Sequence, residues 1–112
     1  MVDDHAAFRS SARRLLELAG YDVVGEAGDG SSALALAREL EPELVLLDIA
    51  LPDMSGFDVA EALAGGRSAV VLVSSRSAAD LGSRATSSGA RGFIPKDRLS
   101  EEALRHLVEG ER

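Results

Sequence analysis

The chain has 112 residues, which suits one domain with a single hydrophobic core and leaves no room for a second. Its formal net charge of -7 disfavours binding to nucleic acids and to anionic membranes, and no apolar run approaches the ~20 residues of a membrane span. Because the chain contains no cysteine, it has neither disulfides nor a thiolate metal site, and we expect a cytoplasmic protein.

The spacing of apolar residues predicts alternating helices and strands from end to end. In chain order these are a helix over residues 6–19, a strand over 23–27, a helix from 29 or 31 to 40, a strand over 44–48, a helix over 57–63, a strand over 69–73, a weak helix over 77–88, a strand over 92–94 and a helix over 100–109. Asp29 or Ser31 is the candidate cap of the second helix, and Pro42 prevents its continuation. Strands that alternate with helices favour a parallel sheet covered on both faces.

The stretch from Leu44 to Gly56, LVLLDIALPDMSG, is the most informative part of the chain. A short apolar run bounded by turn residues is typical of a strand buried on both faces of a parallel sheet. Asp48 stands where this strand ends. Because ligands of open α/β sheets bind outside the carboxyl ends of the strands, the position of Asp48 indicates chemistry rather than packing.

Polar residues also follow the other predicted strands, namely Asp3-Asp4, Ser74 and Lys96. In a parallel sheet these strand ends lie on one edge, so the side chains should converge on Asp48. Two carboxylates ~5 Å apart repel by about 3 kcal/mol at an effective dielectric constant of ~20, so such a cluster calls for a cation. Oxygen ligands suit Mg²⁺, and a carboxylate beside Mg²⁺ and lysine can attack phosphorus. The pattern therefore predicts phosphoryl transfer onto Asp48.

Each of these features also has a purely structural interpretation. Asp3-Asp4 could cap the first helix, residues 51–56 could form an ordinary turn, Ser74 could satisfy a carbonyl at the strand end, and Lys96 could be a solvated loop lysine. What favours a site is their occurrence together and in this order.

With these residues assembled, the chain resembles a response-regulator receiver domain, and the resemblance covers essentially all of residues 1–112. It is carried by VDDH at 2–5, Phe8-Arg9, LLDIALPDMSG at 46–56, VSS at 73–75 and GFIPKD at 92–97. The motifs VDDH, Phe8-Arg9 and GFIPKD are most similar to those of receivers of the LuxR/NarL-like class, which are often fused to helix-turn-helix DNA-binding domains. The resemblance implies a flavodoxin-like α/β fold with a doubly wound parallel sheet of five strands in the order 2-1-3-4-5.

The resemblance also implies roles for the site residues. Asp48 would accept a phosphoryl group from a sensor histidine kinase. Asp4 would bind Mg²⁺ directly, Asp3 would bind it through water, and the carbonyl of Ala50 would complete the protein's share of the metal ligands. Lys96 would contact the phosphoryl group.

Two further residues would form the switch. Ser74 would swing toward the phosphoryl group and Phe93 would turn inward behind it, which changes the surface presented to partners. The domain would catalyse at most its own aspartyl phosphorylation and dephosphorylation. Its expected partners are the kinase and a second copy of the chain, with no direct contact to nucleic acid or membrane.

The chain departs from the receiver pattern at both ends. Family members run four or five apolar residues before the paired acids, whereas here only Met1 and Val2 precede them. A first strand cut short would leave backbone groups unpaired on two neighbouring strands, each costing on the order of 1 kcal/mol or more. We therefore expect either a start upstream of Met1 or a less stable domain. We expect no effector domain within these 112 residues, since the last predicted helix ends close to residue 112.

Three alternatives remain open at this point. The first is a receiver-like interaction domain that works without phosphorylation. The second is a small aspartate-dependent phosphohydrolase, although such enzymes place a second acid two residues after the nucleophile and Asp3-Asp4 are adjacent. The third is a nucleotide-binding flavodoxin-like protein, although no phosphate-binding loop follows the first strand.

Overall fold

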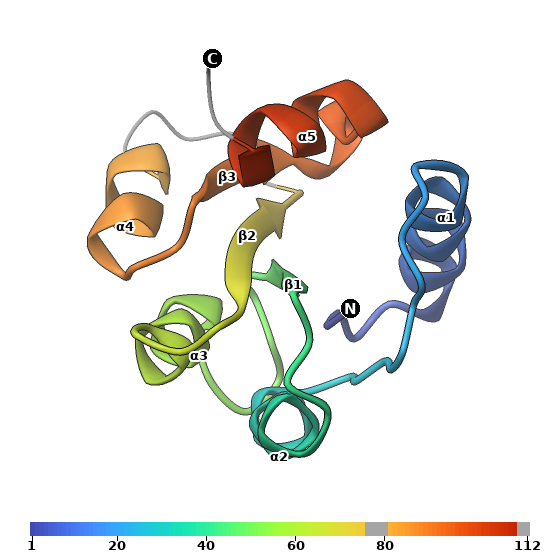
Figure 1. Ribbon diagram of the computed structural model, residues 1–112. Coiled ribbons are helices and arrows are strands. Elements are labelled where there is room, and N and C mark those ends of the chain that lie inside the picture. Colours follow the sequence, from blue (N-terminus) through green and yellow to red (C-terminus); the bar gives the residue numbers. More distant parts are fainter. Residues whose placement is uncertain (76–80, 110–112) are drawn as a thin grey trace.

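The computed structural model describes residues 1–75 and 81–109 (Figure 1). In chain order the elements are α1 (Ala6–Leu18), α2 (Gly30–Leu40), β1 (Leu44–Asp48), α3 (Gly56–Leu63), β2 (Ala69–Ser74), α4 (Leu81–Ser87), β3 (Gly92–Pro95), the short 3-10 helix η1 (Lys96–Arg98) and α5 (Glu101–Glu109). The predicted helices and three of the predicted strands are confirmed, with ends displaced by one or two residues. The first residues of the weak helix predicted over 77–88 lie outside the described residues.

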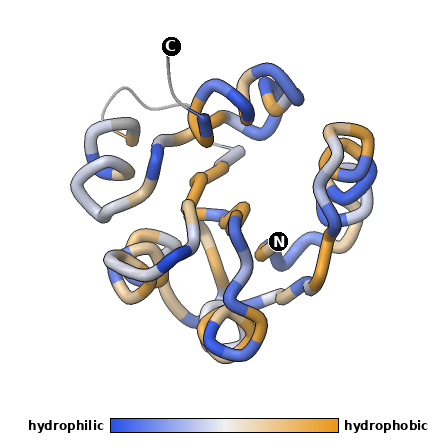
Figure 2. The backbone as a smooth tube through the Cα atoms, viewed as in Figure 1, coloured by the Kyte–Doolittle hydropathy of each residue, from blue (hydrophilic) through white to orange (hydrophobic). Residues whose placement is uncertain are grey.

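The sheet has three parallel strands in the order β1-β2-β3. Leu47, Val71 and Leu72 have no exposed surface, as expected for strands buried on both faces. One hydrophobic cluster includes residues of α2, α3 and α4, and a second includes residues of α1 and α5, so helices cover both faces of the sheet. The hydropathy colours in Figure 2 show the apolar strands at the centre. This arrangement confirms the predicted α/β class.

The expected five strands are reduced to three within the described parts of the chain. Residues 23–27, predicted as a strand, form one isolated bridge, in which Ala27 pairs in parallel with Val2. Val2 also pairs in parallel with Leu47, so it lies between the two segments. A strand requires several consecutive bridge pairs. The segment before Asp3 contributes one bridging residue, Val2, to each of its two neighbours, so residues 23–27 do not form a strand.

Side-chain caps fix where the helices begin. The Asp29 carboxylate accepts a hydrogen bond from the Ser32 amide at 2.7 Å, so Asp29 rather than Ser31 caps α2. Ser55 accepts from the Phe57 amide at 3.1 Å at the start of α3. None of the helices in the described ranges is long and apolar enough to cross a membrane.

Candidate functional site

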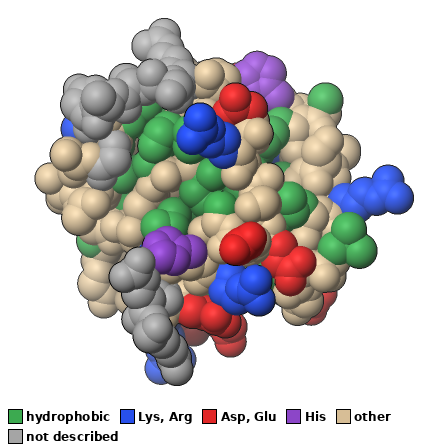
Figure 3. Space-filling model, turned by 90° about the horizontal axis from the view of Figure 1, so that it is seen from above, with side chains coloured by type: hydrophobic (Ala, Val, Ile, Leu, Met, Phe, Trp, Pro, Cys, Tyr) green, Lys and Arg blue, Asp and Glu red, His purple; other side chains and the backbone are tan. Residues whose placement is uncertain are grey.

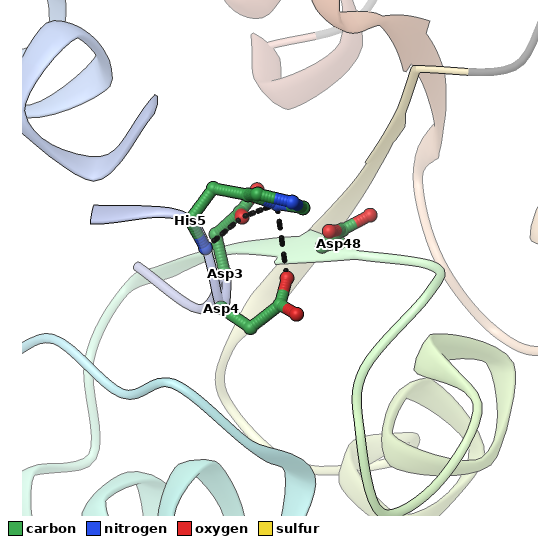
Figure 4. A group of neighbouring side chains, drawn as sticks. All are labelled: Asp3, Asp4, His5 and Asp48. Atoms are coloured by element: carbon green, nitrogen blue, oxygen red, sulfur yellow. Dashed lines mark hydrogen bonds and ion pairs between the residues drawn. The ribbon is translucent and has the colours of Figure 1, made fainter. Parts of the chain in front are cut away.

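The acidic cluster predicted from the strand ends is present at the carboxyl edge of the sheet. Asp48 is the last residue of β1, and Asp3 comes beside it because Val2 pairs with Leu47. Asp3, Asp4, His5 and Asp48 each offer a ligand atom, and these atoms all lie within 4.8 Å of one another (Figure 4). Asp3 is fully buried and Asp48 nearly so, whereas Asp4 is exposed.

Lys96 joins this cluster at the same carboxyl edge, from the end of the outer strand β3. It is the first residue of η1, directly after β3, and its Nζ lies 2.6 Å from Oδ2 of Asp3 and 3.3 Å from Oδ2 of Asp48. The ammonium group also lies over the ring of Phe8, 4.4 Å from the ring centre. Its positive charge thus offsets two buried carboxylates. The prediction that Lys96 faces Asp48 is confirmed, but the contact with Phe8 was not predicted.

Burial and charge shift the pKa values of Asp48 and Lys96. The pKa of Asp48 is raised, mainly because burial disfavours the carboxylate; the Ala50 amide lowers it, the charge of Asp3 raises it and Lys96 lowers it. Burial lowers the pKa of Lys96, but the hydrogen bond to Asp3 and the charges of Asp48 and Asp3 outweigh this effect, and the net pKa is raised. Lys96 therefore stays protonated while it faces the two acids.

His5 is part of the cluster, although sequence reasoning assigned it no role. Its backbone amide donates to Oδ1 of Asp3 at 2.8 Å, and its Nδ1 lies 3.2 Å from that oxygen and 3.0 Å from Oδ1 of Asp4, as the dashed lines in Figure 4 show. Arg9 donates to the backbone carbonyl of Asp3 from α1. These contacts hold the short N-terminal segment at the sheet edge.

The loop after β1 returns tightly to the same edge. The Ala50 amide donates to Oδ1 of Asp48 at 3.2 Å, and Ala50 forms an antiparallel bridge with Ser55. A Cβ atom at Gly56 would lie 2.3 Å from the backbone oxygen of Asp48 and 2.7 Å from Cα of Ile49. The start of α3 can therefore approach Asp48 this closely only with glycine at position 56.

Asp53, in the same loop, binds the start of α2. Its carboxylate accepts from the Gly30 amide at 2.7 Å, and from the amide and the hydroxyl of Ser31, both at 3.0 Å. The hydrogen bonds from Gly30 and Ser31 lower the pKa of Asp53. The sequence predicted only a turn here, because it does not show that this loop and the start of α2 are neighbours.

The two predicted switch residues lie on β2 and β3. Ser74 is buried at the end of β2 and pairs in register with Pro95, next to the pair formed by Asp48 and Val73. Phe93 is half-buried and packs against the hydrophobic cluster that includes residues of α2, α3 and α4. Ser74 is thus at the same edge as Asp48, and Phe93 lies two residues before the end of β3.

The donor set suits a hard divalent cation. Three carboxylates converge, and one oxygen of Asp3, Oδ2, is buried with the ammonium group of Lys96 at 2.6 Å as its close neighbour. Hard oxygen donors of this kind are the ligands that Mg²⁺ prefers. The cluster could therefore hold a metal ion.

The fold and site together define a flavodoxin-like α/β domain with a cluster of acids and a lysine at the carboxyl edge of its sheet. Comparison with known proteins agrees: residues 1–109 match the family described as the response regulator receiver domain. The chain belongs to this family.

Solved structures with the same fold include receivers of the NarL and LuxR groups. The signal receiver domain of the putative response regulator NarL from Mycobacterium tuberculosis matches with a TM-score of 0.87 at 35% identity, over 98% of this chain and 94% of that one. A two-component response regulator of the LuxR family from Aurantimonas sp. matches with a TM-score of 0.87 at 30% identity, over 99% and 84% of the two chains.

Among curated proteins, the chain is 38% identical over 107 residues to a putative transcriptional regulator of Pseudomonas aeruginosa. This alignment covers 93% of this chain and 52% of that protein. It is 37% identical to the nitrate/nitrite response regulator protein NarP of Escherichia coli over an alignment of 118 positions. This alignment covers 100% of this chain and 55% of that protein. The chain thus spans about half the length of these relatives.

Proposed function

We propose that this chain is a phospho-accepting switch that receives a phosphoryl group on Asp48 from the phosphohistidine of a sensor kinase. The observation that supports this most directly is the placement of Asp48, buried at the sheet edge with Lys96 Nζ at 3.3 Å and two further acids in the same cluster. A buried carboxylate facing a lysine and other acids is suited to phosphoryl transfer rather than to packing.

In the proposed reaction Asp48 is the nucleophile. One of its carboxylate oxygens forms a bond to phosphorus while the bond between phosphorus and the histidine nitrogen breaks, and the electron pair stays on that nitrogen, which takes up a proton. In the metal-free protein, burial raises the pKa of Asp48 and so makes its carboxylate more basic.

Mg²⁺ would be held by Asp3, Asp4, Asp48 and the carbonyl of Ala50. When bound, the ion would neutralise charge on the oxygens of the transferring group. With the acids compensated in this way, the ammonium of Lys96 is available to a phosphoryl oxygen. Lys96, which bridges Asp3 and Asp48 in this structure, would then bind the phosphoryl group on Asp48.

The phosphoryl group would act on partners through Ser74 and Phe93. Ser74 would hydrogen-bond to it, and Phe93 would turn inward and alter the surface of β3 and α5. A groove of about 500 Å³ lies there, lined among others by Phe93, Ala103 and Leu107. Figure 3, seen from the side where α5 lies, shows hydrophobic side chains between charged ones. This surface would receive the output partner or a second copy of the chain.

Intact-mass measurement after incubation with acetyl phosphate and MgCl₂ tests the proposal. We expect a gain of one phosphoryl group, which is lost in Asp48→Asn and retained in Asp58→Asn, a control that changes an exposed acid on α3. A gain that persists in Asp48→Asn, or no gain in the unaltered chain under these conditions, would overturn it.

A further inference from the structure

His5 stands at the N-cap position of α1 but does not cap the helix. Helices favour Ser, Thr, Asp or Asn at this position, because these side chains accept a hydrogen bond from the first free amides. The His5 side chain makes no such bond within the described part of the chain. Its ring is turned instead toward the carboxylates of Asp3 and Asp4, as Figure 4 shows. The helix start thus forgoes a side-chain cap, and the imidazole joins the acidic cluster.

One nitrogen of this ring faces two carboxylate oxygens at once. Nδ1 of His5 lies 3.0 Å from Oδ1 of Asp4 and 3.2 Å from Oδ1 of Asp3. Nδ1 carries at most one hydrogen, which the two oxygens would have to share. The spacing is also that of neighbouring ligands of one metal ion, since ligand atoms ~2.1 Å from an ion and at right angles to each other are about 3.0 Å apart.

The charges around these atoms suit a divalent cation. The carboxylates of Asp3, Asp4 and Asp48 face the single positive charge of Lys96, which leaves two negative charges when all three acids are ionised. Lys96 engages Oδ2 of Asp3, and Oδ1 of that residue accepts from the His5 amide at 2.8 Å and keeps a second lone pair. A neutral imidazole adds a ligand atom to this group without adding charge.

The site is also open to solvent on the side of His5. The side chain of His5 is 68% exposed and that of Asp4 is 38% exposed, so an ion can reach both without any opening of the fold. A nitrogen ligand changes which ion is preferred there. Oxygen ligands suit Mg²⁺, whereas imidazole suits Zn²⁺ and Ni²⁺, and affinity at mixed nitrogen and oxygen sites rises along the first-row transition series.

We propose that His5 is a ligand of this cation site and gives it a preference for Zn²⁺ and related divalent transition-metal ions over Mg²⁺. Three consecutive residues would supply the ligands, namely one oxygen each from Asp3 and Asp4 and Nδ1 from His5. The inference rests on the cation site of the proposed function and adds to it that the two kinds of ion compete for Asp4. His5 would thus determine which ion occupies the cluster when both are present.

Calorimetric titration of the metal-free chain, without an affinity tag, tests this proposal. Zn²⁺ and Mg²⁺ are titrated separately, and the quantity that decides is the ratio of their affinities. His5→Asn should lower this ratio roughly tenfold or more by weakening Zn²⁺ binding, with little change in Mg²⁺ binding. His5→Asp should lower it too, because an oxygen ligand replaces the nitrogen. His106→Asn, which changes the chain's other histidine on the exposed face of α5, is the matched control and should keep the ratio.

The visible absorption of bound Co²⁺ gives a second measurement, because its bands report nitrogen ligation. We expect the bands to change in His5→Asn and to stay the same in His106→Asn.

Equal losses of Zn²⁺ and Mg²⁺ affinity in His5→Asn would overturn the proposal, because His5 would then only position the acids. An unchanged ratio would overturn it as well, since His5 would be a hydrogen-bond partner and no ligand. An equal effect of His106→Asn would show unspecific binding to surface histidines and would also overturn it. No phosphodonor is used, so a failure of phosphorylation at Asp48 and a failure of this proposal can be told apart.

Discussion

The ammonium group of Lys96 lies between two buried carboxylates, 2.6 Å from Oδ2 of Asp3 and 3.3 Å from Oδ2 of Asp48. Removing one partner of a buried ionic group leaves the others uncompensated, which costs more than the original interaction contributed. This relationship makes Lys96 a structural residue in the resting protein as well as a candidate ligand of the phosphoryl group.

Lys96→Met should lower the free energy of unfolding by about 3 kcal/mol at neutral pH without bound metal, because Asp3 and Asp48 then face each other unpaired. The raised pKa of Lys96 means that its stabilisation is complete below the ordinary value of 10.5 and is lost only as the pH rises through the folded-state pKa. Urea denaturation gives the measurement. Arg98→Met, an exposed change on η1, is the control; an equal loss in both variants would contradict the assignment.

Asp48→Asn should stabilise the metal-free domain at neutral pH. A carboxyl group with a raised pKa favours the protonated form in the folded state, so its ionisation works against folding. The gain in thermal midpoint should be absent below pH 3.8, the ordinary value, should appear as the pH rises above it, and should be complete above the folded-state pKa. A pH series of melting curves with EDTA would show this, and a variant that is less stable at pH 7 would contradict it.

Mg²⁺ should raise the thermal midpoint, since the proposed site exists only in the folded arrangement of the acids. At a concentration ten times its Kd the ion adds about 1.4 kcal/mol. Asp4→Ala should remove most of this shift and still fold, because Asp4 is exposed. Asp58→Ala, which removes an acid on α3 outside the cluster, should keep the shift. Equal responses to Mg²⁺ in the two variants would exclude Asp4 as a ligand.

Gly56→Ala should destabilise the domain by about 1–3 kcal/mol and disturb the site, because the added methyl group meets backbone atoms of Asp48 and Ile49 that cannot move aside cheaply. Gly28→Ala is the matched control, since its nearest neighbour would be Nη1 of Arg9 at an ordinary 3.7 Å. The readouts are the urea midpoint and the phosphorylation rate. Similar effects of the two substitutions would show that the close approach at Gly56 is unimportant.

Asp53→Asn should lower the thermal midpoint by less than Lys96→Met. Asp53 is exposed, and the asparagine that replaces it keeps one side-chain oxygen that can accept a hydrogen bond from the start of α2. The depressed pKa of Asp53 means that its contribution is present above the ordinary value of 3.8 and is lost as the pH falls through the folded-state pKa. The difference between variant and parent should therefore shrink in acid. A difference that grows in acid would contradict this linkage.

The sequence predicted those parts of the fold whose signals are local. The apolar run that ends at Asp48 and the capping residue Asp29 correspond to observed elements, as does the convergence of Asp3, Asp48 and Lys96 at one edge. Convergence was predictable because a parallel sheet brings all its carboxyl ends together.

The features that the sequence did not predict depend on long-range pairing or on side-chain direction. Residues 23–27 have the composition of a strand, but the segment that pairs with them contributes one bridging residue, as expected from the short first strand that the sequence shows. Likewise, nothing local indicates that Phe8 covers Lys96, or that Asp53 lies on the start of α2. These contacts join segments that are far apart in the sequence.

The two-sided bridge of Val2 determines how the native protein should open locally. Residues 25–27 are joined to the N-terminal segment by three backbone hydrogen bonds, all with Met1 or Asp3, whereas β1 and β2 share a continuous ladder of five pairs. Segments with few backbone bonds open at a lower free energy than the global unfolding transition. Residues 25–27 should therefore detach as a small cooperative unit well before the sheet unfolds, and each such opening would release Asp3 from one of the two segments that hold it beside Asp48.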